Sequence, residues 1–197
     1  MNPIAVAVIV LLAGSTFASA GPLHDTAIAG DVEKVGVLLS QGADIDARSD
    51  AGETPLSLAI LGGHPAVAEF LIEQGAAIDG RNAGGFTPLH AAAYAGDAAI
   101  AALLIDHGAD IDDAHNKAGV TPLFPAIEED HEAVAELLIA RGANLALKER
   151  HGYAPLTRAL FKDHKDMVAL LRAHGAECQS PDVLGDSLHR ECLEAGK

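Results

Sequence analysis

The chain has 197 residues, of which 49% are hydrophobic and 21% are charged, and this composition is typical of a folded protein. It contains 28 Asp and Glu residues against 13 Lys and Arg residues, for a formal net charge of -15. An acidic surface repels phosphate backbones, so we expect no nucleic acid partner; the charge favours a basic partner or simply serves solubility.

Residues 1–20 have the pattern of a secretory signal peptide. The run Ile4–Leu12 is apolar, and small residues then lead to Ala18-Ser19-Ala20, a typical cleavage site. The run is shorter than the roughly 20 residues of a transmembrane helix. No Lys or Arg precedes it, so an uncleaved amino-terminal anchor is the alternative. We expect cleavage after Ala20 and a periplasmic or secreted protein that is not attached to a membrane.

From Gly21 onward the chain repeats with a period of 33 or 34 residues. Thr-Pro-Leu or a close variant recurs as TPLSLA from Thr54, TPLHAA from Thr87, TPLFPA from Thr121 and APLTRA from Ala154. Thr followed by Pro predicts a helix start, because the Thr oxygen can cap the helix and Pro loses no hydrogen bond at the first helical position. Gly-Ala pairs in the same register predict the end of a second helix, and they occur at 42–43, 75–76, 108–109, 142–143 and 175–176.

These phased motifs resemble the ankyrin-repeat family over residues 21–177, and we expect an exported bacterial member. The resemblance implies an all-α repeat solenoid of five stacked helix-turn-helix units with projecting β-hairpin turns. The predicted repeats are 21–53, 54–86, 87–120, 121–153 and 154–177, and residues 178–197 are expected to form a C-terminal capping segment. Contact between neighbouring repeats stabilises such arrays.

The only two cysteines, Cys178 and Cys192, lie in the capping segment. In an oxidising compartment such a pair is expected to form a disulfide. Two alternatives remain open, namely free thiols and a zinc site completed by His174 and His189.

No other pattern predicts chemistry. His64, His131 and His164 occupy the same place in successive repeats, which indicates a structural role. The cluster Glu128–Glu132 is interpreted as a solvated turn rather than a metal site. The sequence contains no phosphate-binding glycine loop, nucleophile elbow or zinc-helix histidine pair, so we expect no enzyme, no cofactor and no metal.

The family resemblance implies that a protein partner binds at the turn ends and the first helices of the repeats. Four of the six aromatic residues beyond residue 20 fall at such positions, and aromatic side chains supply much of the energy of interfaces. The alternative is that they pack against neighbouring turns. We predict a monomeric interaction module with an unidentified partner; a metal-binding or enzymatic envelope protein built on the repeats is the second hypothesis. The predicted partner-binding residues are Glu53, Leu61, Phe86, Tyr94, Lys117, Val120, Glu128, Arg150, Tyr153 and Phe161.

Overall fold

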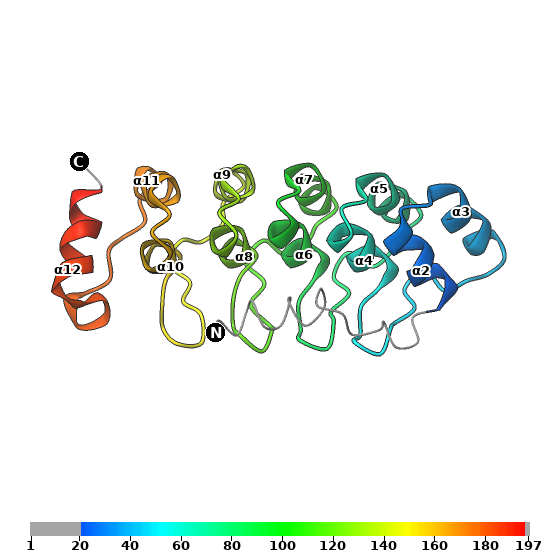
Figure 1. Cartoon of the computed structure of the whole chain (residues 1–197), viewed down its shortest axis with the longest axis horizontal. Coiled ribbons are helices and arrows are strands. Elements are labelled where there is room, and N and C mark those ends of the chain that lie inside the picture. The colour runs from blue at the N-terminus through cyan, green and yellow to red at the C-terminus, as the bar shows by residue number, and fades with distance from the viewer. Residues whose placement is uncertain (1–20, 196–197) are drawn as a thin grey trace. The chain divides into compact units, whose positions relative to one another are not determined.

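A computed structural model describes residues 21–195 of the chain (Figure 1). The predicted signal peptide therefore lies outside the described residues. The chain divides into two compact units, a first unit of Met1–Asp110 and a second unit of Ile111–Lys197, which are described separately. Within residues 21–195, no helix is long and apolar enough to cross a membrane.

The first unit contains three helix pairs. The pairs are α2 (Pro22–Ala29) with α3 (Val32–Ser40), α4 (Pro55–Leu61) with α5 (Pro65–Glu73), and α6 (Pro88–Ala95) with α7 (Ala98–Asp106). First helices pack on first helices, α2 on α4 and α4 on α6, and second helices pack in the same order. The core between them is made of fully buried aliphatic side chains, including Leu56, Leu71, Leu89, Ile100 and Leu104.

The second unit contains two pairs and a final helix. The pairs are α8 (Leu123–Glu128) with α9 (Glu132–Ala140) and α10 (Pro155–Lys162) with α11 (Lys165–Ala173), and α12 (Pro181–Glu194) packs on α10. Its largest fully buried side chains include Phe124, Leu138, Leu156, Met167 and Leu171. Each of the five predicted repeats thus holds one helix pair, and the predicted all-α repeat fold is confirmed.

The helices begin and end at the residues that the repeat motif predicts. The Thr54 hydroxyl oxygen accepts a hydrogen bond from the Ser57 N–H at 3.2 Å, and Thr87 forms a reciprocal cap with His90. Each second helix is followed by the Gly of a Gly-Ala pair in a left-handed conformation, for example Gly42 with φ 89° and Gly142 with φ 94°. Residues with a Cβ rarely adopt this conformation, which explains the glycine.

Helix α8 is the exception, because it starts at Leu123 rather than directly after Thr121. Pro125 has no N–H to donate to the Thr121 carbonyl, so the first turn lacks a helical bond. The Phe124 N–H donates to that carbonyl instead, at 3.0 Å, in a tighter turn. This makes α8 a helix of 6 residues.

Turns project from each unit at the ends of the first helices, but residues 21–195 contain no strand. A turn is closed by a backbone hydrogen bond such as Ser49 N–H to the Glu53 carbonyl, 3.0 Å, or Glu149 N–H to the Tyr153 carbonyl, 3.1 Å. The predicted β-hairpins are therefore short loops with hairpin-like closure, too short for a regular ladder.

The capping segment is joined to itself by a disulfide between Cys178 and Cys192, so the predicted pairing is confirmed. Their sulfur atoms are bonded to one another, whereas a zinc site requires thiolates. Within residues 21–195 no group of His, Cys, Asp and Glu side chains has a geometry suited to a metal ion. Gly185, with φ 75° and ψ 158°, interrupts α12 near its start.

Candidate partner-binding surface

Three of the predicted partner-binding residues are buried, and for these the prediction was wrong. Glu53, Val120 and Glu128 have relative exposures of 2%, 0% and 5%. Glu53 and Val120 directly precede the Thr of a repeat, at the root of a turn rather than at its end. Glu128 closes α8, where the side chains of the following first helix cover it.

Glu53 joins two turns of the first unit. Its carboxylate accepts a hydrogen bond from the Asn82 side-chain amide at 2.7 Å. Burial raises the pKa of the Glu53 carboxyl above its ordinary value, and the Asn82 hydrogen bond and the Arg48 charge offset only part of this effect. The Glu53 carboxyl therefore links the two turns, and its burial disfavours the ionised form.

Glu53→Gln is expected to gain stability relative to the wild type as the pH rises. A raised pKa means that the folded state holds the proton more tightly than the unfolded state, so the stability of the wild type falls as the pH rises above the ordinary pKa of 4.5. The Gln side chain stays neutral and can still accept from Asn82. Urea unfolding between about pH 4 and pH 7 would measure the difference. Glu73→Gln, on the exposed side of α5, is the control, and a difference independent of pH for Glu53→Gln would contradict the prediction.

Glu128 is held by two cations from α10. Its carboxylate oxygens lie 2.9 Å from Arg158 Nε and 2.8 Å from Lys162 Nζ. The interpretation of residues 128–132 as a solvated turn is therefore wrong for Glu128, although Glu129 and Asp130 are exposed. The ion pairs connect the first helices of the last two repeats.

The predicted aromatic residues fall into two sets, one in each unit. In the first unit, Phe86 packs edge-to-face on His90 with the ring centres 5.5 Å apart. Leu61, Phe86 and Tyr94 are all half-buried. The Phe86 ring is held against the first turn of α6 by this contact.

In the second unit, Tyr153 and Phe161 form an edge-to-face pair with ring centres 5.0 Å apart. Phe161 stands at the end of α10 and is 42% exposed, whereas Tyr153 is half-buried beneath it. The exposed Phe161 ring therefore packs on the half-buried Tyr153 ring.

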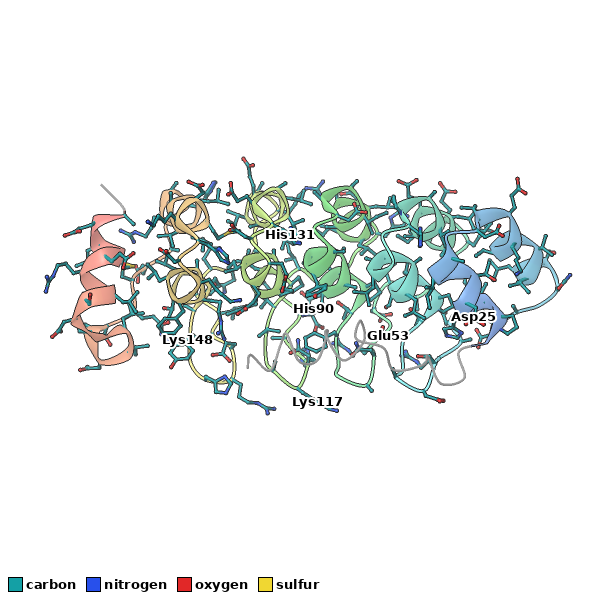
Figure 2. All side chains as sticks on the ribbon, in the orientation of Figure 1. Asp25, Glu53, His90, Lys117, His131 and Lys148 are labelled. Atoms are coloured by element: carbon teal, nitrogen blue, oxygen red, sulfur yellow. A yellow bond between two sulfur atoms is a disulfide. The ribbon has the colours of Figure 1, made fainter. Side chains whose placement is uncertain are left out.

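The predicted cations Lys117 and Arg150 are exposed on turns of the second unit, and Figure 2 shows Lys117 on its turn. Lys148, which is not among the predicted residues, is exposed and directly precedes the turn that carries Arg150. A signal for it was available, because this turn reads Lys148-Glu149-Arg150-His151 in an otherwise acidic chain.

Two of the recurring histidines, His64 and His164, make contacts with the preceding repeat, as a structural role requires. His64 Nε2 is 2.7 Å from the Ile28 carbonyl of the preceding repeat, and His164 Nδ1 lies 3.4 Å from the Asp130 carboxylate. Both side chains connect one repeat to the next.

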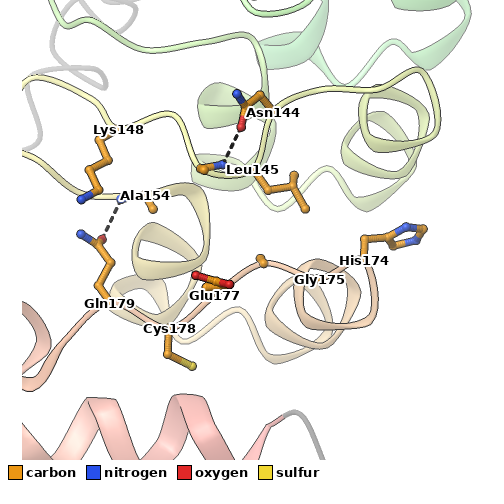
Figure 3. A pocket seen from close by; sticks show the side chains of 11 residues that line it. Asn144, Leu145, Lys148, Ala154, His174, Gly175, Glu177, Cys178 and Gln179 are labelled. Atoms are coloured by element: carbon orange, nitrogen blue, oxygen red, sulfur yellow. Dashed lines mark hydrogen bonds between the residues drawn. The ribbon is translucent and has the colours of Figure 1, made fainter.

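A groove of about 570 Å³ lies between the last two repeats, along the segments 144–148 and 174–179 (Figure 3). At earlier repeat boundaries an Asp side chain fills the equivalent place. Asp46 accepts from the Ala77 N–H at 2.8 Å, and Asp112 accepts from the Asn144 N–H at 2.9 Å. The equivalent residue here is Ala146, which has no side-chain oxygen to accept from the Glu177 N–H. We expect the missing carboxylate to be the reason that the groove is open.

Ala146→Asp is expected to raise the free energy of unfolding by about 1 kcal/mol, the usual net contribution of a hydrogen bond. The new carboxylate can accept from the Glu177 N–H as Asp112 does from Asn144. Asp112→Ala is the matched variant, and it should lose a similar amount. If thermal unfolding shows that Ala146→Asp is no more stable than the wild type, the groove is not the result of a missing Asp.

Comparison with known proteins agrees with this geometry. A family model described as "Ankyrin repeats (3 copies)" matches residues 23–115 and 112–182. A stretch of 48 residues is 42% identical to human protein phosphatase 1 regulatory subunit 27, and 41% identical to the mouse protein of the same name. The match covers 24% of this chain and 31% of each relative. It therefore reflects shared repeats and leaves most of each relative unmatched.

Proposed function

Because the chain belongs to the ankyrin-repeat family, whose repeats are protein–protein interaction modules, we propose that it is exported and binds a protein partner as a monomer. The proposed contact surface comprises the exposed turn ends and the solvent-facing ends of the first helices. Ankyrin repeats typically serve as non-enzymatic scaffolds, which agrees with this role. The signal-peptide pattern of residues 1–20 and the Cys178–Cys192 disulfide support a periplasmic or secreted location.

The exposed Phe161 ring carries the proposal. Phe161 is 42% exposed, and the Tyr153 ring supports it from below. A large apolar side chain that the core does not use, held in one orientation by a neighbour, has the properties of an interface anchor. The other partner-binding candidates that remain exposed, Lys117 and Arg150, lie on turns of the same unit.

The test is site-specific photocrosslinking in cells that naturally produce the protein. A photoreactive aromatic amino acid replaces Phe161 in one version and Leu193 in another. Leu193 is the matched control, because it is 48% exposed but lies on α12. We expect a crosslinked protein from position 161, absent from position 193. Absence of a crosslink at 161, or the same products from both positions, would contradict the proposed surface.

Export is tested by the intact mass of the same material. Cleavage after Ala20 predicts a chain that begins at Gly21. A full-length chain recovered in the membrane fraction would contradict export as a cleaved protein and favour the anchored alternative.

A further inference from the structure

We propose that the turn ends of the second unit bind an acidic segment of the partner, although the protein itself carries a formal net charge of -15. This inference rests on the proposed function and adds the chemistry of the partner. It replaces, for this surface, the expectation of a basic partner that the overall charge favours.

The charge is distributed unevenly along the chain. Residues 1–110 contain three Lys or Arg residues and thirteen Asp or Glu residues. Residues 111–197 contain ten Lys or Arg residues and fifteen Asp or Glu residues. Most of the positive charge therefore belongs to the second unit. The positions of these side chains on that unit determine which ligands its surface attracts.

The acidic side chains of the two turns in this unit point inward. Asp113 is 3% exposed and accepts from the His115 N–H, and Glu149 is 4% exposed and accepts from the His151 N–H. Asp112, which is half-buried, accepts from a backbone N–H of the next repeat. These carboxylates stabilise the turns and present little negative charge to solvent.

The cationic side chains of the same turns point outward. Lys117, Lys148 and Arg150 are exposed. Within residues 21–195 none of their side chains makes a hydrogen bond or an ion pair. The Arg150 backbone N–H donates to the Ala118 carbonyl at 3.0 Å, so the two turns lie side by side. Lys117 and Arg150 thus lie on neighbouring turns without a carboxylate partner among residues 21–195, whereas Lys148 lines the groove that the exposed Glu177 also lines. Figure 2 labels Lys117 and Lys148 on these turns.

The turns of the first unit provide an internal comparison. Its turn arginines are engaged, since Arg48 donates to the carbonyls of Gly52 and Arg81, and Arg81 donates to the Gly85 carbonyl. Asp50 is exposed on the Arg48 turn. These arginines therefore stabilise their own turns, whereas the side chains of Lys117 and Arg150 in the second unit make no such hydrogen bonds.

The negative charge of the rest of the protein favours some acidic partners over others. At physiological ionic strength, charges are screened over about 8 Å, so a short acidic segment at the turn ends interacts mainly with Lys117 and Arg150. An extended polyanion such as a nucleic acid also meets the acidic surroundings, which repel it. A short stretch of Asp or Glu residues in a folded or flexible protein fits this surface best.

The experiment uses the exported full chain and a short fluorescent peptide of alternating Glu and Gly residues as the probe. Lys117→Glu/Arg150→Glu is the test variant. Lys165→Glu/Arg190→Glu is the matched control, since both residues are exposed in the second unit but lie on α11 and α12. The control changes the net charge equally. Fluorescence anisotropy in low salt and in physiological salt measures affinity.

We expect the test variant to bind the Glu peptide about tenfold more weakly than the wild type, the effect of losing two surface charge interactions. The control should stay within about twofold, because its charges act only at a distance. Equal losses in both variants, or no binding by the wild type in low salt, would overturn the inference. So would tighter binding of a Lys-Gly peptide, of single-stranded DNA or of phosphatidylglycerol vesicles.

Photocrosslinking from position 161 separates this inference from the proposed function. If the charge-reversal variant keeps the Phe161 crosslink undiminished, the partner-binding function stands and the acidic-segment inference fails. If the crosslink is lost together with peptide binding, both are supported. If position 161 never forms a crosslink, the proposed function fails whatever the peptide shows.

Discussion

Leu104→Ala is expected to lower the free energy of unfolding of the first unit by about 2 to 5 kcal/mol. Leu104 lies on α7 and is fully buried. The truncation removes apolar surface from the core and leaves a cavity, because α5 and α6, which pack against α7, cannot collapse into it without losing their own contacts. Urea unfolding followed by circular dichroism would measure the loss.

The control for this prediction is Leu193→Ala, which makes the same chemical change at a side chain that is 48% exposed on α12. It should change stability by less than about 0.5 kcal/mol, as most surface substitutions do. Similar losses in the two variants would mean that Leu104 is not part of a close-packed core.

Replacing both Cys178 and Cys192 with Ser is expected to destabilise the second unit by about 3 kcal/mol in the chain-entropy model. The disulfide closes a loop with a sequence separation of 14, and its loss gives the unfolded capping segment more conformations. The buried Cys192 also leaves a Ser hydroxyl in an apolar place, which adds to the loss. The measurement is the urea midpoint of the exported protein and of the variant.

A reductant provides the control. It should lower the midpoint of the wild type to near that of the double Ser variant and leave the variant unchanged. Labelling of native, unreduced protein with a thiol reagent should find no free cysteine. Full labelling without reductant would show that the disulfide is absent from the exported protein.

The fold could be predicted from the sequence because the residues that start and end helices recur in every repeat. Thr54 and Thr87 start helices, and Gly42 and Gly142 end them, as the physics of caps requires. Pro125 lies four residues after Thr121, so the loss of that helical bond could be predicted from the sequence, whereas the late start of α8 at Leu123 required the structure.

The candidate site was harder to predict because the repeat register does not reveal burial at the turns. Glu53 and Val120 stand at the same repeat position as Phe86 and Tyr153, but the first two are fully buried and the latter two are half-buried. How deeply a side chain is buried there depends on the adjacent turn, as Asn82 shows for Glu53. The basic turn around Lys148 could be recognised in the sequence, but the burial of its neighbour Glu149 is visible only in the structure.

Ala146 also determines how the end of the array opens. The Cys178–Cys192 bond ties α12 to the end of the last repeat but does not cross the boundary at Ala146. On the groove side that boundary lacks the carboxylate bridge, although the Gln179 side-chain amide donates to the Gly152 carbonyl at 2.9 Å. On the side of the helices, Glu128 still binds Arg158 and Lys162, and Asp130 lies 3.4 Å from His164. The last repeat and α12 should therefore separate from their neighbours as one cooperative block, hinged at Glu128, before the rest unfolds. Phe161 belongs to that block, so a partner that holds it also sets the rate of amide hydrogen exchange through α11 and α12.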